Sequence, residues 1–143
     1  MTEQDLMRLA VEMLDKAYVP YSHFPVGAAL ECEDGTVYTG CNIENAAFPC
    51  TICAERTAMF KAISEGHRSF HRIVIAGKSE DFCVPCGSCR QVMREFAPEL
   101  EVICLNGKGE AKHYTLCQLL PESFGPGIPP APAALSHRSG GLC

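Results

Sequence analysis

Five cysteines stand in two short stretches of the sequence, at spacings that suit metal ligation. Two lie in residues 48–55 (FPCTICAE) and three in residues 81–90 (DFCVPCGSCR). Zinc sites with four protein ligands are closed and structural, whereas sites with three protein ligands keep a position for water and are catalytic. The number of cysteines that bind the ion therefore separates a structural module from an enzyme.

Pro85 divides the three downstream cysteines into two groups. Proline suits the first position of a helix and holds the residue before it in an extended conformation. We therefore predict a helix over residues 85–97 that begins at Pro85 and leaves Cys83 outside. Cys86 and Cys89 would lie in its first turn, where side chains three positions apart have Cβ atoms about 5–6 Å from one another. This pair is the strongest local signal for a metal site.

The upstream stretch offers a third ligand and a carboxylate. Residues 53–65 (CAERTAMFKAISE) are rich in helix-forming residues and are followed by Gly66, a residue common just after a helix. Cys53 would open this helix, and Cys50 would precede it. Glu55 would share a helix face with four apolar residues, Ala58, Met59, Ala62 and Ile63. A carboxylate in such a buried stripe requires an explanation.

Two explanations account for Glu55. An acidic residue in the first turn of a helix favours the positive end of the helix dipole and accepts a free N–H group. Alternatively, Glu55 is a general acid and base beside a metal-bound water. That is the arrangement of zinc deaminases, whose signature is H-x-E followed by P-C-x-x-C, with Cys permitted in place of His. Here the matching residues are Cys53-Ala54-Glu55 and residues 85–89.

Charge also favours three ligands over four. Three thiolates and one Zn²⁺ carry a formal charge of about −1, while two helix N-termini contribute about +0.5 each, and Arg56 and Arg90 are adjacent cations. A fourth thiolate would lower the charge to about −2 and take the place of the water. We therefore predict one Zn²⁺ per subunit, held by Cys53, Cys86 and Cys89, with the two arginines beside the site.

The composition is that of a soluble protein from a reducing compartment. The chain has 143 residues, 47% hydrophobic and 20% charged, and no apolar run near the roughly 18 residues of a membrane span. Its net charge is −5 and no two Lys or Arg residues are adjacent, which disfavours binding to nucleic acid. The N-terminal residues lack the pattern of a secretory signal. We expect a cytoplasmic protein whose cysteines are metal ligands and buried thiols.

The distribution of apolar residues predicts an α/β fold. Helices are predicted over residues 3–17, 53–65, 85–97 and 115–120, and strands over 25–32, 36–42, 71–77, 100–105 and 111–115. The order strand, helix, strand over residues 71–105 implies a parallel pair. Residues 1–124 are predicted to form a single domain, and the Pro/Gly-rich residues 125–143 a mobile tail.

Several motifs together resemble the small, homo-oligomeric, zinc-dependent cytidine deaminases. The likeness covers residues 5–125 and rests on 21–29 (YSHFPVGAA), 40–46 (GCNIENA), 53–58 (CAERTA) and 85–96 (PCGSCRQVMREF). The resemblance implies a three-layer α/β/α fold with a five-stranded mixed sheet, and a homotetramer whose active sites are completed by neighbouring subunits. It also implies hydrolytic deamination of cytidine and 2′-deoxycytidine to uridine and 2′-deoxyuridine, with release of ammonia, in pyrimidine salvage.

The resemblance assigns roles to single residues, most of which have a structural alternative. Asn42 and Glu44 would bind the ribose hydroxyls, although a polar turn after a strand also explains them. Phe24 would pack against the nucleoside, or belong to the core. The backbone of Ala54 would meet the pyrimidine carbonyl, while Glu55 would bond the ring nitrogen and the amino group.

Two further aromatic residues bear on this assignment. Phe124 matches an aromatic residue that in this family reaches into the pocket of another subunit, or it anchors the C-terminal helix. Phe48 stands where many relatives have Tyr, so that a hydroxyl contact to the sugar from this position is absent here.

Two rival functions remain open from the sequence. A deaminase of nucleic acid or of another amino-heterocycle would share the motif, but the acidic net charge and the pair Asn42 and Glu44 favour a free nucleoside. A structural zinc module with four cysteines would use Cys50 or Cys83 as its fourth ligand.

Overall fold

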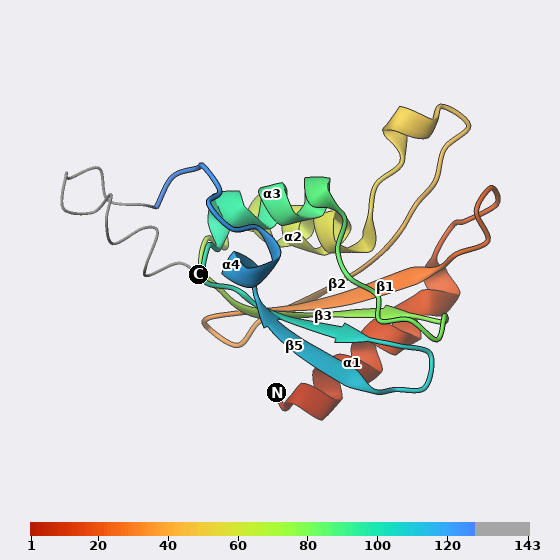
Figure 1. Cartoon of the computed structure of the whole chain (residues 1–143), viewed down its shortest axis with the longest axis horizontal. Coiled ribbons are helices and arrows are strands. Elements are labelled where there is room, and N and C mark those ends of the chain that lie inside the picture. Colours follow the sequence, from red (N-terminus) through yellow and green to blue (C-terminus); the bar gives the residue numbers. More distant parts are fainter. Residues whose placement is uncertain (128–143) are drawn as a thin grey trace.

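The protein folds around a five-stranded mixed sheet. In the computed structural model, which describes residues 1–127, the strands are β1 (Val26–Cys32), β2 (Val37–Cys41), β3 (Phe70–Gly77), β4 (Glu101–Leu105) and β5 (Ala111–Thr115). Their order across the sheet is β2-β1-β3-β4-β5 (Figure 1). β3 and β4 are parallel and the other neighbours are antiparallel, so the predicted sheet and its parallel pair are confirmed.

Helices cover both faces of this sheet. α1 (Glu3–Glu12) lies on one face, whereas α2 (Ala54–Ser64) and α3 (Gly87–Phe96) lie next to each other on the opposite face (Figure 1). The buried side chains form two clusters, one between α1 and the sheet and a larger one beneath α2 and α3. The predicted three-layer α/β/α fold is therefore confirmed. The remaining helices are short: α4 (Leu116–Leu119) and the 3₁₀ turns Met13–Lys16 and Phe48–Cys50.

The first helix begins where the sequence predicts, but it changes from an α-helix to a 3₁₀ helix before its predicted end. Thr2 and Asp5 form a reciprocal capping box, which satisfies two backbone N–H groups at the start of α1. The helix predicted to run to residue 17 is α-helical only as far as Glu12 and continues as the 3₁₀ turn. Such tightening is common in the last turn of a helix.

The predicted start of the third helix at Pro85 is wrong, because α3 begins two residues later at Gly87. Cys86 keeps an extended backbone (φ −68°, ψ 167°), and its carbonyl accepts the first helical hydrogen bond from the N–H of Arg90 at 3.0 Å. Cys86 is therefore the N-cap residue rather than part of the first turn. Cys53 occupies the same position before α2, with φ −80° and ψ 158°.

Gly40 brings α2 close to the edge of the sheet. A Cβ atom at this position of β2 would lie 2.4 Å from the carbonyl oxygen of Ala54 and 2.7 Å from the backbone nitrogen of Ala58. Both neighbours are backbone atoms of the same helix and cannot rotate away. The absence of a side chain at Gly40 thus sets the distance between β2 and the start of α2.

Arg94 ties the segment after α4 to the rest of the domain. Its side chain is buried on α3, and its guanidinium donates hydrogen bonds to Ser123 Oγ (2.8 Å), to the carbonyl of Pro126 (2.7 Å) and to that of Gly125 (3.4 Å). These contacts include the first residues of the predicted tail. Residues 128–143 of that tail lie outside the described residues.

Within the described range, no helix has both the length and the apolar character that a membrane span requires.

We predict that Gly40→Ala lowers the stability of the protein. The added methyl group would overlap the backbone of α2, and such overpacking costs about 1–3 kcal/mol in the free energy of unfolding. Urea unfolding of the zinc-loaded protein, at matched protein concentration, measures the change. Gly87→Ala is the matched control, because no atom lies within 4 Å of a Cβ at that position. Equal stability of Gly40→Ala and wild type would contradict the close approach.

Candidate metal centre

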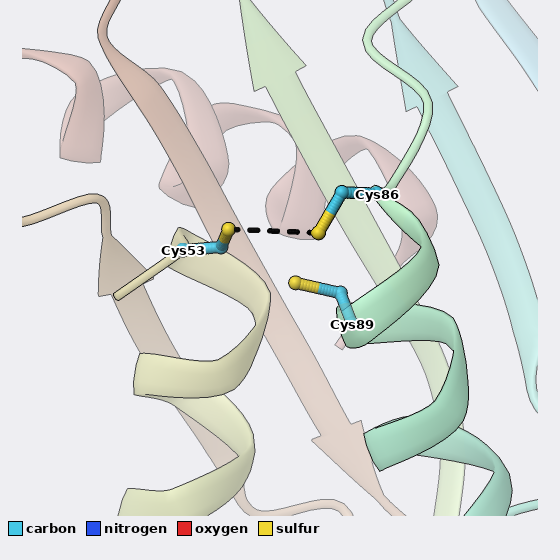
Figure 2. Close-up of side chains that lie close together, drawn as sticks. All are labelled: Cys53, Cys86 and Cys89. Carbon is cyan, nitrogen blue, oxygen red and sulfur yellow. Dashed lines mark hydrogen bonds between the residues drawn. The ribbon is translucent and has the colours of Figure 1, made fainter. Parts of the chain in front are cut away.

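Two helix N-termini bring three cysteines together. Cys53 stands at the start of α2, and Cys86 and Cys89 stand at the start of α3. Figure 2 shows their sulfur atoms pointing toward one another from the two neighbouring helices. Because both N-cap residues are cysteines whose side chains accept no capping hydrogen bond, their thiols are available to a ligand.

The spacing of the sulfur atoms suits one tetrahedral ion. The Sγ atoms of Cys53 and Cys86 are 3.8 Å apart, and those of all three cysteines lie within 4.8 Å of one another. Two sulfurs at the usual Zn–S distance of about 2.3 Å, separated by the tetrahedral angle, are about 3.8 Å apart. The residues present therefore fit a zinc ion.

The environment favours the thiolate form of Cys53. Hydrogen bonds from Cys89, and then from Arg56 and Cys86, lower the pKa of Cys53 to about 5 although burial opposes them. Arg56 contributes through its Nη2 atom, which lies 3.3 Å from the sulfur. Cys89 is fully buried, and its hydrogen bond to Cys53 raises its own pKa. In the absence of metal the negative charge therefore resides on Cys53.

Glu55 lies beside the sulfur atoms in the first turn of α2. Only 4% of its surface is exposed. Of the four apolar residues predicted on its helix face, Ala58, Met59 and Ala62 are fully buried and Ile63 is half-buried. Burial raises the pKa of Glu55 to about 7, and the charge of Cys53 adds to this effect. A carboxyl group of this kind can hold or release a proton near neutral pH.

Cys50 and Cys83 stand apart from this cluster. Cys50 ends the 3₁₀ turn and is exposed. Cys83 donates its backbone N–H to Leu105, and burial raises the pKa of its thiol to about 12. Neither sulfur lies within 4.8 Å of all three clustered sulfurs. Residues 1–127 thus offer three converging thiols, which does not support the closed four-cysteine module.

The two arginines predicted beside the site differ in their contacts. Arg56 reaches the sulfur of Cys53, as described above. Arg90 instead donates from Nε to the carbonyl of Pro85 and from Nη1 to that of Leu119, each at 2.7 Å. Its contacts in the described structure connect the loop before α3 to the end of α4.

The side chain of Asn42, directly after β2, is hydrogen-bonded to the start of β1. Its Oδ1 accepts the backbone N–H of Val26, and its Nδ2 donates to the carbonyl of Phe24, both at 2.9 Å. An amide nitrogen carries two hydrogens, so one donor of Asn42 stays available. Phe24 itself is 43% exposed and therefore does not belong to the core.

Glu44 fixes the loop that follows the first helix. It accepts hydrogen bonds from the backbone of Tyr21 and Ser22 and from the Ser22 hydroxyl, which lowers its pKa. The carboxylate borders a cavity of about 410 Å³ lined by Tyr21, Ser22, Glu44, Phe48 and Thr51. Ser22 and Thr51 were not identified from the sequence. Ser22 lies within the matched motif 21–29 but had no assigned role, and the only signal for Thr51 was its place just before the motif 53–58.

Ala54 and Phe124 occupy contrasting environments. Ala54 is fully buried at the start of α2, where its backbone follows directly from Cys53. Phe124 is 77% exposed after α4, and its carbonyl accepts a hydrogen bond from Gln91. The exposed ring does not anchor the C-terminal helix within this chain.

Within residues 1–127 eight cysteines are free thiols, among them all five of the two motif stretches. Cys117 in α4 is disulfide-bonded. This differs from the expectation that the cysteines are metal ligands and buried thiols.

Three convergent thiols beside a buried carboxyl group define a candidate zinc site of the catalytic kind, and the comparisons with known proteins agree. Residues 1–105 match the family model of the cytidine and deoxycytidylate deaminase zinc-binding region. The chain is 53% identical over 111 residues to a cytidine deaminase of Sporosarcina psychrophila, covering 77% of this chain and 82% of the relative. It is 46% identical over 125 residues to that of Halalkalibacterium halodurans, covering 87% and 95%.

A solved structure shows the same likeness in three dimensions. The crystal structure of cytidine deaminase from Burkholderia pseudomallei matches with a TM-score of 0.84 at 45% identity, covering 87% of this chain and all of the other. The chain belongs to the cytidine and deoxycytidylate deaminase family. It binds one zinc ion per subunit, for which the three-thiol cluster is the candidate site.

We predict that Cys86→Ser abolishes zinc binding at this centre, because two remaining thiols cannot hold the ion tightly. Zinc is measured by elemental analysis after dialysis against metal-free buffer. Cys50→Ser and Cys83→Ser serve as controls and should each retain one zinc per chain. Full occupancy in Cys86→Ser, or loss of zinc in either control, would contradict the three-thiol assignment.

Proposed function

We propose that the protein hydrolyses cytidine and 2′-deoxycytidine to uridine and 2′-deoxyuridine, releasing ammonia. The observation that carries this proposal is Glu55, a buried carboxyl group beside three convergent thiols. The named relatives are cytidine deaminases, which supports cytidine as the substrate. In this proposal Cys53, Cys86 and Cys89 are the zinc ligands and Glu55 is the catalytic acid and base.

The chemistry requires a water molecule to replace the amino group of the pyrimidine. Zinc, when bound, supplies acidity by lowering the pKa of a coordinated water from 15.7 towards about 7. Glu55 accepts a proton from the attacking water and delivers it to the ring nitrogen. The water oxygen bonds to the amino-bearing carbon. Glu55 then takes the second proton from the new hydroxyl group and passes it to the amine, so that the C–N bond breaks, ammonia leaves and the carbonyl of uridine forms. Its raised pKa suits both directions of transfer.

The remaining assigned residues would hold the nucleoside. Glu44 is an ionised acceptor bordering a cavity, and Asn42 retains a free N–H donor, so the pair suits ribose hydroxyls. The exposed ring of Phe24 would pack against the substrate. The backbone at Ala54, between the ligand Cys53 and Glu55, would meet the pyrimidine carbonyl.

We further propose a cytoplasmic homotetramer that acts in pyrimidine salvage. Large aromatic side chains are exposed on the described chain, Phe48 at 68% and Phe124 at 77%. Exposed aromatic side chains are typical of surfaces that another subunit covers. Eight of the nine cysteines in residues 1–127 are free thiols, which supports a reducing compartment, whereas the disulfide-bonded Cys117 does not.

We predict that Glu55→Gln retains zinc and loses about 10²–10⁴-fold in kcat. The amide keeps the shape of the side chain but cannot transfer the proton, and general acid–base catalysis typically contributes this factor. The conversion of cytidine to uridine is followed by absorbance, with zinc analysis of the same sample.

The wild-type protein tests the substrate class in the same assay. Cytidine and 2′-deoxycytidine should be converted. Cytosine should not be, because it lacks the sugar that Asn42 and Glu44 would bind. CMP should not be either, because it adds a phosphate for which no cation is assigned. A normal kcat in zinc-replete Glu55→Gln protein would contradict the proposed role of Glu55 as acid and base. If the wild-type protein converted neither cytidine nor 2′-deoxycytidine, the proposed function would be wrong.

We predict that Phe124 serves the active site of another subunit. Phe124→Ala should raise KM for cytidine, because the substrate loses an aromatic contact, and leave the zinc content unchanged. Mixed oligomers of Phe124→Ala and Glu55→Gln should show lower KM than Phe124→Ala alone, since some intact sites combine Glu55 from one chain with Phe124 from another. Mixed oligomers that show only the KM of Phe124→Ala would exclude sharing. Exposed Phe60 on α2, changed to Ala, provides the control.

A further inference from the structure

We propose that Cys32, Asp34 and His67 form a second metal site, which takes a divalent ion of borderline softness such as Zn²⁺. The three residues come from the end of β1, from the turn before β2 and from the loop after α2. The three-thiol cluster lies at the N-terminus of α2, whereas His67 lies just beyond its C-terminus. The 11 residues of this helix separate the two sites by roughly 16 Å.

The distances between the candidate ligand atoms suit a single ion. The thiol sulfur, a carboxylate oxygen and an imidazole nitrogen all lie within 4.8 Å of one another. Nδ1 of His67 is 3.5 Å from Oδ2 of Asp34. A nitrogen and an oxygen bound to the same tetrahedral zinc, at about 2.0–2.2 Å each, are about 3.4 Å apart.

The hairpin turn holds two of the three ligands in place. The backbone N–H of Cys32 donates to Thr36 at 2.8 Å, and its carbonyl accepts the N–H of Gly35 at 3.0 Å. Oδ1 of Asp34 accepts the N–H of Thr36 at 2.9 Å, which leaves Oδ2 for an ion. The pairing of β1 with β3 shifts register between Glu31 and Cys32, an irregularity of the kind that redirects a side chain.

The end of α2 holds the third ligand. Gly66 and His67 close the helix with hydrogen bonds to the carbonyls of Ile63 and Ala62, which is a Schellman motif. The imidazole packs edge-on against Tyr38, with ring centroids 5.3 Å apart. His67 is therefore fixed in backbone position and in ring orientation before any ion binds.

The donor set indicates the class of ion. A thiol, an imidazole and a carboxylate together suit Zn²⁺ or Co²⁺, whereas Mg²⁺ and Ca²⁺ prefer oxygen ligands alone. Cys32 is almost fully buried, which raises the pKa of its thiol to about 11, so an ion must displace the proton as it binds. Asp34 is exposed and offers an entry path. Three protein ligands would leave one position of a tetrahedral ion for water.

Cobalt titration tests this site on full-length protein that holds one zinc per chain, so that the three-thiol centre is filled and the second site is open. With the three-thiol centre already filled by zinc, added Co²⁺ should bind at one ion per chain and give the near-ultraviolet absorption of a cobalt–thiolate bond. Asp34→Asn, which retains Oδ1 for the turn, and His67→Gln should each weaken cobalt binding by at least about tenfold. His71→Gln changes an exposed histidine outside the cluster and should bind cobalt like wild type.

Three results would overturn the proposal. The first is no thiolate absorption on addition of Co²⁺, and the second is equal binding by wild type, Asp34→Asn and His67→Gln. The third is release of zinc in step with cobalt uptake, which would place the cobalt at the three-thiol centre. Because the measurement is cobalt absorption, a failure here is distinct from failure of the proposed deamination. Cytidine turnover by Asp34→Asn should equal that of wild type.

Discussion

The convergence of thiol sulfurs on two helix N-termini is the constraint on which the rest of the site depends. Each N-terminus carries free N–H groups and a partial positive charge, and both favour a thiolate at that position. Cys53 and Cys86 occupy the N-cap positions, where Ser, Thr, Asp or Asn would ordinarily bond the helix itself. A metal that binds these sulfurs joins α2 to α3, so that ion binding and helix placement stabilise each other.

The sheet determines where those two N-termini meet. β3, α3 and β4 form a parallel crossover unit, while α2 packs on β1 and β2 beside it. Gly40 lets the first turn of α2 approach β2 closely, and this places Glu55 under cover beside the sulfurs. The carboxyl group is consequently held out of water by packing, which is the main cause of its raised pKa.

Local patterns in the sequence predict the helices and strands, the Cys86 and Cys89 pair and the burial of Glu55, because each depends on spacing within one helix or strand. The family resemblance implies the three layers of the fold, and the deaminase signature joins Cys53 to the pair. The exact start of α3 did not follow from Pro85, since helix propensity does not reveal that Cys86 stays extended to serve as the N-cap. The contacts of Arg90 with Leu119, and the hairpin turn beside His67, join residues distant in sequence. Such pairings arise from tertiary packing and have no local signal.

The hydrogen bonds of Arg94 show that the folded unit extends at least to Pro126. Composition places the boundary after residue 124, where the Pro/Gly-rich segment begins. Two of the three acceptors of the buried guanidinium, however, are the carbonyls of Gly125 and Pro126. A chain cut after Phe124 would leave a buried cation short of partners, which is strongly destabilising. Gly125 and Pro126 therefore pack with the rest of the described chain, although their sequence alone resembles a linker.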